Sequence, residues 1–169
     1  FVAALPQGAV VGTSSLRRRP QLLPRRPDLK VVEFRGNVQT RLRKLEDGVA
    51  EATFLAVAGL RRLGMLDLAE AGIAPEDMLP AVAQGAIGIQ CRDDDARALK
   101  YIAALNHDET FTCVSCERAF LAALDGNCKT PIAGQARIID GQIHFDGLVS
   151  SLDGSKMFRA SKVGAIADA

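Results

Sequence analysis

The first half of the chain alternates short apolar runs with segments of helical spacing. Apolar runs at residues 9–11, 29–34 and 52–58 predict strands, and the third is apolar almost throughout, which is typical of a strand buried on both faces. Helices are expected from about Leu16 and from about residue 38 to Gly48, where Val38, Leu42 and Leu45 mark the buried stripe. Strands that alternate with helices indicate right-handed crossovers and a mainly parallel α/β sheet.

Three residues mark where these helices begin, bend and end. Asn37 is expected to be the N-cap of the second helix, and Gly48 to terminate it. Pro20 stands several residues inside the first predicted helix, where a proline removes a hydrogen bond and clashes with the preceding turn. We therefore expect that helix to kink at Pro20.

Residues 80–91 have the composition of a hinge between domains. The segment contains small residues and glycines before a predicted strand that ends near Cys91. Residues 93–95 are three aspartates that predict the cap of a helix reaching about Leu105, and a longer helix is expected over residues 108–124.

After residue 128 the apolar period changes from helical to alternating. Residues 136–139, 143–149 and 157–161 predict strands, and the Asp-Gly pairs at 140–141 and 153–154 predict the turns between them. The sequence thus predicts an α/β domain followed by a small α+β domain with an antiparallel three-stranded sheet.

Length and composition are those of a globular protein. The chain has 169 residues, of which 48% are hydrophobic, and its longest apolar stretches are far shorter than the roughly 20 residues needed to cross a bilayer. The first residue is not Met and the chain ends in an alanine-rich segment, so we expect a fragment at both ends. The four cysteines are irregularly placed and are expected to be reduced thiols in an intracellular protein.

Positive charge is concentrated in one segment. Residues 17–44 hold ten of the 21 Lys and Arg residues and only two acids, a local net charge of +8 in a chain whose net charge is +1. Such a segment indicates an anionic partner, either a nucleic acid or a small polyanion, unless it is simply a solvated face. Only one aromatic residue, Phe34, lies among these charges, whereas single-strand binders interleave many, so a small anion is favoured.

The expected anion site lies at one edge of the predicted sheet. The hydroxyls of residues 13–15 form a turn between the first strand and its helix, and Arg17 and Arg18 follow. Arg35 stands at a strand end and Arg41 one turn into a helix. Strand ends and helix starts meet at the ligand crevice of open α/β folds, and guanidinium forks suit carboxylates.

Cys128 is the most attractive nucleophile in the sequence. It lies in a Gly-Asn-Cys-Lys loop, and the neighbouring Lys129 would favour its thiolate. Cys113 and Cys116 form a CxxC pair inside a predicted helix without further ligands at metal spacing, so helix packing is favoured for them, and Cys91 is expected in the core. His107 and His144 have no partner at triad or metal spacing, and we expect no metal.

Seven blocks of this sequence resemble the hydroxymethylbilane synthase (porphobilinogen deaminase) family in order and spacing. The resemblance covers essentially the whole chain. The blocks are Val-Gly-Thr-Ser-Ser-Leu-Arg-Arg at 11–18, Arg-Gly-Asn-Val-x-Thr-Arg at 35–41, Ala-Val-Ala-Gly-Leu at 56–60, Leu-Pro-Ala-Val at 79–82, Gln-Gly-Ala-Ile-Gly at 84–88, Cys-Glu-Arg-Ala-Phe at 116–120 and Gly-Asn-Cys-Lys-Thr-Pro-Ile at 126–132.

The resemblance implies a three-domain transferase of heme and chlorophyll biosynthesis, whose first two domains are like periplasmic binding proteins. Residues 1–79 would belong to domain 2, residues 80–104 to the hinge and the segment that returns to domain 1, and residues 105–169 to domain 3. The enzyme joins four porphobilinogens head to tail with loss of ammonia and releases hydroxymethylbilane. Its catalytic aspartate would lie in the missing N-terminal domain 1, so this fragment alone is expected to be inactive.

The resemblance also assigns roles to residues of this chain. Cys128 would carry a dipyrromethane cofactor through a thioether. Its carboxylates would be held by the cofactor-binding set Thr13, Ser14, Ser15, Arg17, Arg18 and Arg41. Incoming porphobilinogen and the growing chain would be bound by Arg35, Arg41 and Arg62, with Gln84 lining the cleft.

Expectations about partners and location follow from the same resemblance. The full-length protein would be a monomer in the cytoplasm or plastid stroma, without nucleic-acid or membrane partners. Two alternatives remain open, namely a non-catalytic periplasmic-binding-type domain that senses a small carboxylate and a nucleic-acid-binding module that uses residues 17–44.

Overall fold

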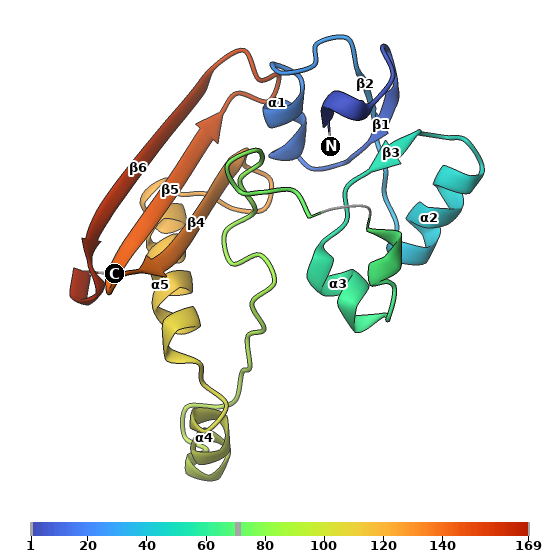
Figure 1. Ribbon diagram of the computed structural model, residues 1–169. Helices are drawn as coiled ribbons and strands as arrows, with labels where there is room; N and C mark the ends of the chain where they lie inside the picture. Colours follow the sequence, from blue (N-terminus) through green and yellow to red (C-terminus); the bar gives the residue numbers. More distant parts are fainter. Residues whose placement is uncertain (1, 70–71, 169) are drawn as a thin grey trace.

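The computed structural model describes residues 2–69 and 72–168 and contains two separate three-stranded sheets (Figure 1). The elements fall into an N-terminal unit, an extended connection and a C-terminal unit. Their bounds are β1 Val10–Gly12, α1 Arg18–Leu22, β2 Lys30–Val32, α2 Val38–Glu46, β3 Ala52–Thr53, α3 Val57–Arg62, α4 Ala96–Ala103, α5 Asp108–Ala123, β4 Ile132–Ile139, β5 Gln142–Ser150 and β6 Met157–Ala165, with short 3₁₀ helices at Val2–Ala4, Leu66–Leu68 and Ile166–Asp168.

The first sheet is parallel, with the strand order β2-β1-β3. Its central strand buries Val11 completely, and the adjoining core contains Leu22 from α1 and Leu29 and Phe54 from the strand flanks. The α/β prediction is therefore confirmed for this unit, although β2 and β3 are shorter than their apolar runs predicted.

The second sheet is an antiparallel meander in the order β4-β5-β6, and α5 packs against it (Figure 1). The Phe120 ring of α5 meets the Phe145 ring of β5 with 4.9 Å between centroids. Asp140 and Gly141 both have positive φ, 49° and 74°, as a tight primed turn between β4 and β5 requires. The predicted α+β unit with a three-stranded antiparallel sheet is confirmed.

Most predicted caps are present in the structure. The Asn37 side chain accepts a hydrogen bond from the Thr40 N–H at 2.8 Å, and Asp95 accepts one from the Ala98 N–H at 2.9 Å. α2 ends at Glu46, two residues before Gly48, whose φ is +71°. The expected stripe of α2 is only half-buried.

Two predictions about the first unit are wrong. The strand expected over residues 52–58 stops at Thr53, because β1 ends at Gly12 and offers no partner beyond it, and the residues that follow enter α3. Pro20 does not kink its helix: α1 begins only at Arg18, so Pro20 lies in the first turn, where backbone N–H groups have no intrahelical acceptor.

The strand expected before Cys91 does not form. Residues 86–95 run as an extended connection to α4, which stands away from both sheets (Figure 1). Ile87 and Ile89 are 70% and 52% exposed, and Cys91 is half-buried rather than in a core. A strand requires a neighbouring strand to satisfy its backbone groups, and among the described residues this segment has none.

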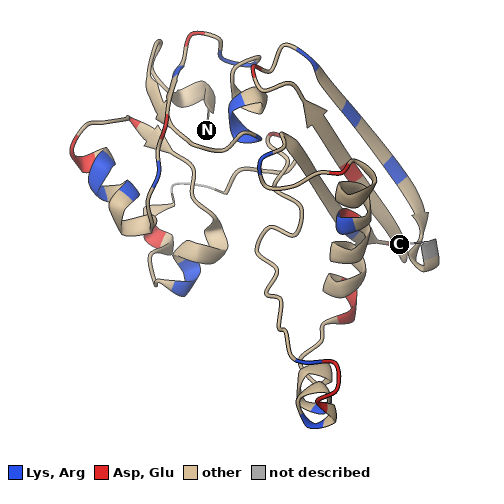
Figure 2. Ribbon diagram, turned by 180° about the vertical axis from the view of Figure 1, so that it is seen from behind, with Lys and Arg blue, Asp and Glu red and all other residues tan. Residues whose placement is uncertain are grey.

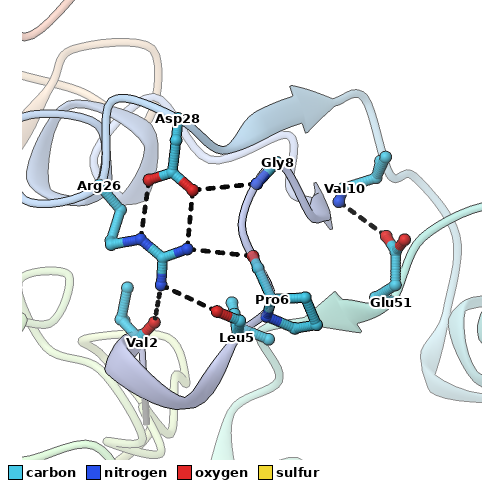
Figure 3. Close-up of polar contacts among 8 residues, drawn as sticks. All are labelled: Val2, Leu5, Pro6, Gly8, Val10, Arg26, Asp28 and Glu51. Carbon is cyan, nitrogen blue, oxygen red and sulfur yellow. Dashed lines mark hydrogen bonds and ion pairs between the residues drawn. The ribbon is translucent and has the colours of Figure 1, made fainter.

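An ion-paired network closes the N-terminal segment over the first sheet (Figure 3). The Arg26 guanidinium donates to both carboxylate oxygens of Asp28 at 2.8 Å and to the backbone carbonyls of Val2, Leu5 and Pro6. Asp28 also accepts from the Gly8 N–H at 3.0 Å. These hydrogen bonds to the charged form, first of all those from Arg26, hold the pKa of Asp28 well below its usual range.

The network predicts how stability changes in acid. Because the folded-state pKa of Asp28 is lowered, its stabilising contribution is present at neutral pH and is lost as pH falls from about 4 toward that lowered pKa. Asp28→Asn should therefore lower the free energy of unfolding at pH 7 and flatten its decline between pH 4 and 2. Urea unfolding across that pH range measures both effects, and an acid limb identical to that of the unsubstituted protein would contradict this account.

Candidate functional site

The turn after β1 is held by its own hydroxyls. Thr13 Oγ1 accepts from the Ser15 N–H at 3.2 Å, and Ser14 Oγ accepts from the Phe34 N–H at 2.9 Å. The Phe34 ring lies directly on Gly12, where an added Cβ would come within 2.4 Å of the ring. Ser15 Oγ lies 3.4 Å from the Arg18 N–H, a long contact, and α1 starts later than predicted.

Arg17 and Arg18 emerge from this turn at the start of α1. Arg18 Nη1 donates to the Phe54 carbonyl at 2.9 Å, and its guanidinium lies 5.6 Å from the centre of the Phe54 ring. Burial lowers the pKa of both arginines, and for Arg18 the positive charges of Arg17 and Arg41 lower it further. The fold thus brings Arg17 and Arg41 close enough to Arg18 for their charges to repel it, and the predicted roles of these residues remain predictions.

These three guanidiniums lack a carboxylate partner among the described residues. None of the ion pairs in residues 2–69 and 72–168 includes Arg17, Arg18 or Arg41, although Arg41 Nε donates to the Gly36 carbonyl at 2.9 Å. Figure 2 shows Lys and Arg positions on α1, α2 and α3. Positive charges that are half-buried and mutually repulsive have the properties of an anion site.

A cavity of about 650 Å³ lies beside this cluster. Most of its wall is apolar, and the polar residues that line it are Arg17, Arg18, Glu51, Thr53 and Gln84. The Glu51 carboxylate accepts a hydrogen bond from the Val10 N–H at 2.7 Å. Its size and lining are those of small-molecule sites, which combine apolar surfaces with a few polar groups.

Cys128 is exposed in the loop between α5 and β4, and side-chain hydrogen bonds hold this loop. Asn127 Oδ1 accepts from the Lys129 N–H at 2.8 Å, and Thr130 Oγ1 accepts from the Asn127 N–H at 2.9 Å. Burial lowers the pKa of Arg17, and the negative charge of a Cys128 thiolate, which belongs to the other unit, raises it. Cys128 thus lies close enough to Arg17 for the charges of the two groups to interact.

Arg35 and Arg62 are exposed to solvent. The Arg35 side chain is 78% exposed and pairs with Glu33 at 2.6 Å. Arg62 is exposed in the last turn of α3. Their roles in binding substrate remain predictions.

The buried polar residues that the sequence analysis missed include Gln21 and Glu117. Gln21 on α1 and Glu117 on α5 are each only 6% exposed. Burial raises the pKa of Glu117, while hydrogen bonds from the Ala136 and Ala83 N–H groups lower it. Glu117 could have been found, since it falls at i+3 from Val114 and four residues before Leu121 on one helix face.

The cysteines differ enough to predict their order of reaction. Burial raises the pKa of the Cys113 and Cys116 thiols. Neither thiol belongs to a group of three or more potential metal ligands among the described residues. Because the thiolate is the nucleophile, Cys128 should be alkylated at least about tenfold faster than either one. Limited iodoacetamide labelling at pH 7.5 followed by peptide mass mapping gives the order, and prior labelling of Cys113 or Cys116 would contradict it.

No helix among the described residues is both long and apolar enough to span a membrane.

Comparison with known proteins identifies the family of the chain. Residues 1–100 match the family model "Porphobilinogen deaminase, dipyromethane cofactor binding domain", and residues 111–169 match "Porphobilinogen deaminase, C-terminal domain".

Curated relatives match along almost the whole chain. It is 59% identical over 167 residues to a porphobilinogen deaminase of Paracoccus denitrificans (99% of this chain, 53% of the relative). It is 56% and 55% identical to chloroplastic porphobilinogen deaminases of Pisum sativum and Oryza sativa, covering 97% and 96% of this chain and 45% and 46% of those proteins. The chain thus spans about half the length of the curated relatives it matches, and it belongs to the porphobilinogen deaminase family.

Proposed function

We propose that this chain is the C-terminal part of a hydroxymethylbilane synthase, a transferase that condenses four porphobilinogens head to tail with loss of ammonia. The observation that carries the proposal is the pairing of an exposed Cys128 with a cluster of guanidiniums that lack carboxylate partners among the described residues. A nucleophile that bears a polycarboxylate and a site that binds carboxylates are what such an enzyme requires.

The residues present fit a dipyrromethane held covalently on Cys128. Its acetate and propionate groups would pair with Arg17, Arg18 and Arg41, whose half-buried charges would gain charge-assisted hydrogen bonds. The hydroxyl turn at residues 13–15 would complete this set. When bound, the cofactor supplies the free pyrrole position to which porphobilinogen units are added.

The remaining roles concern substrate and growing chain. Arg35, Arg41 and Arg62 would bind carboxylates of incoming porphobilinogen, for which Arg35 must exchange its contact with Glu33. Gln84 lines the cavity beside Arg17 and Arg18 and would contact the chain there. The catalytic aspartate would be contributed by an N-terminal domain 1 outside this chain.

The same proposal divides the chain into three segments. Residues 1–79 would form part of a periplasmic-binding-like domain 2, residues 80–104 the hinge and the return to domain 1, and residues 105–169 most of domain 3. Ile87 and Ile89 are exposed, which supports the proposal that the return segment packs against domain 1, outside this chain. We place the enzyme in the cytoplasm or the plastid stroma, as a monomer.

The two alternatives make different demands on Cys128 and on residues 17–44. A sensor of small carboxylates would leave the thiol unmodified and bind its ligand reversibly. A nucleic-acid-binding module would lose affinity steeply with salt. Neither explains why an exposed cysteine should stand beside the guanidinium cluster.

Covalent loading is the first prediction of the proposal. The full-length protein purified from cells that make porphobilinogen should carry the mass of a dipyrromethane, and peptide mapping should place it on Cys128, the exposed thiol of the loop. Cys128→Ser is the matched control and should lack the added mass. An adduct on Cys91, Cys113 or Cys116, or none in active enzyme, would exclude the assignment.

The arginines should divide by role. Arg17→Leu or Arg18→Leu should block cofactor loading, because each cofactor carboxylate would lose a partner worth roughly 1.5 to 3 kcal/mol. Arg35→Leu and Arg62→Leu should load cofactor normally but stall chain growth. Intact mass measures loading, and product formation from porphobilinogen measures elongation.

Arg19→Leu is the control for these variants, since Arg19 is exposed on the same short helix. It should behave as the unsubstituted enzyme in both assays. Normal turnover by all four other variants would mean that the cluster is only a solvated face.

The 169-residue chain by itself should not make hydroxymethylbilane. The second wall of the cleft and the catalytic acid would both be missing, so neither positioning nor charge stabilisation would be available. The assay follows uroporphyrin after incubation with porphobilinogen, with and without a separately supplied N-terminal half. Sustained turnover by the chain alone would show that the catalytic acid lies within it.

A further inference from the structure

The side-chain amide of Gln21 joins α1 to the segment that follows the first unit. Gln21 Nε2 donates to the Leu79 carbonyl at 3.1 Å, and Gln21 Oε1 accepts from the Leu79 N–H at 2.9 Å. The same Nε2 donates to the Arg17 carbonyl at 3.1 Å. A residue that is 6% exposed thus satisfies both backbone groups of Leu79 and fixes the backbone of Arg17.

Leu79 in turn belongs to the core of the second unit. Its side chain is 2% exposed and packs with Ala133 of β4 and Leu148 of β5. The next residue, Pro80, accepts a hydrogen bond from the Gly134 N–H at 3.1 Å. The backbone that Gln21 holds is therefore anchored to the sheet that follows Cys128.

Glu117 extends this anchor toward α5. Its carboxylate accepts from the Ala83 N–H at 2.6 Å and from the Ala136 N–H at 2.8 Å, so it ties the hinge to β4. Ala83 has a φ of +57°, an unfavourable conformation for a residue with a Cβ, which the hydrogen bond helps to maintain. The segment from Leu79 to Ala83 thus moves with α5 and β4, the elements on either side of the Cys128 loop.

A second contact holds α1 against the second sheet. Pro20 is fully buried, and Gly154, in the turn between β5 and β6, approaches it so closely that a Cβ on Gly154 would lie 3.0 Å from its Cα and carbonyl oxygen. Figure 1 shows α1 beside the end of the β5–β6 hairpin. This contact packs α1 against the sheet, whereas the Gln21 amide is the group that joins the Arg17 backbone to Leu79 among the hydrogen bonds of the described residues.

We propose that Gln21 is a positioning residue that sets the Arg17 guanidinium against the Cys128 loop by linking α1 to Leu79. The proposal rests on the proposed function for its purpose, since a cofactor attached to one unit must meet carboxylate-binding groups on the other. Without the amide, α1 would keep its place beside Gly154 but the Arg17 backbone would lose its tie to the second unit.

Alkylation of Cys128 by a charged and a neutral reagent tests the proposal. Iodoacetate and iodoacetamide attack the same thiolate, so the ratio of their rate constants reports the local electrostatic field rather than access or thiolate fraction. A guanidinium nearby favours the anionic reagent, and its removal in Arg17→Leu should lower the ratio by about threefold. The protein is the full-length form purified without cofactor, at low ionic strength.

Gln21→Met should lower the ratio by a similar factor, because Met keeps the length of the side chain but makes none of the three hydrogen bonds. Gln39→Met, an exposed position on α2, is the matched control and should leave the ratio unchanged. The ratio at Cys113 serves as an internal reference. A purely structural role for Gln21 would change both rates together and leave their ratio intact.

Gln21→Ala keeps the test decisive if Gln21→Met does not fold. The smaller side chain leaves room for water to satisfy the Leu79 backbone groups, and the ratio should again fall about threefold. An unchanged ratio in the folded Gln21 variants would overturn the proposal, and so would an unchanged ratio in Arg17→Leu. Alkylation needs no porphobilinogen, so a failure of the proposed function, seen as the absence of an adduct on Cys128, is read separately.

Discussion

The burial of Leu79 between the two units is the constraint on which the site depends. Its side chain completes the core around Ala133 and Leu148, while its N–H and carbonyl groups must find partners away from water. Gln21 provides both partners from α1. Through these hydrogen bonds, the buried Leu79 links α1, at whose start Arg17 and Arg18 lie, to the sheet that follows the Cys128 loop.

The charge distribution of the site has a cost that a ligand would offset. Arg17 and Arg18 are partly removed from water, and Arg18 is repelled by both Arg17 and Arg41. Charges held in this way destabilise the folded chain until an anion neutralises them. In the proposed enzyme, the cofactor would be the permanent counterion of the cluster as well as the primer on which the product is assembled and from which it is released.

The two units differ in how completely they are enclosed. The second sheet has a continuous ladder of eight or nine residues per strand and a helix across it, whereas the first has strands of two or three residues. Ile87 and Ile89 of the connection and Leu99 and Tyr101 of α4 are open to solvent. These features agree with the proposal that the first unit and the connection normally pack against a further domain.

Local features of the sequence were sufficient to predict several parts of the molecule. Asn37 and Asp95 cap helices because a side-chain oxygen two or three residues before a free N–H can reach it in almost any context. The Asp140-Gly141 turn follows from the positive φ that it requires. The interaction of Arg18 with Arg17 and Arg41 agrees with their places at helix starts, and the exposure of Cys128 agrees with its place in a polar loop.

Tertiary structure decided whatever depends on a partner distant in sequence. The third strand ends at Thr53 because β1 ends at Gly12, and no strand forms before Cys91 because no neighbour is available there among the described residues. Gln21 and Glu117 become buried anchors only because Leu79, Ala83 and Ala136 are brought to them by the fold. Residue type and spacing determine local conformation and which side chains are chemically able to bind or react. Which polar atoms lose their contact with water is determined by packing between segments that are distant in the sequence.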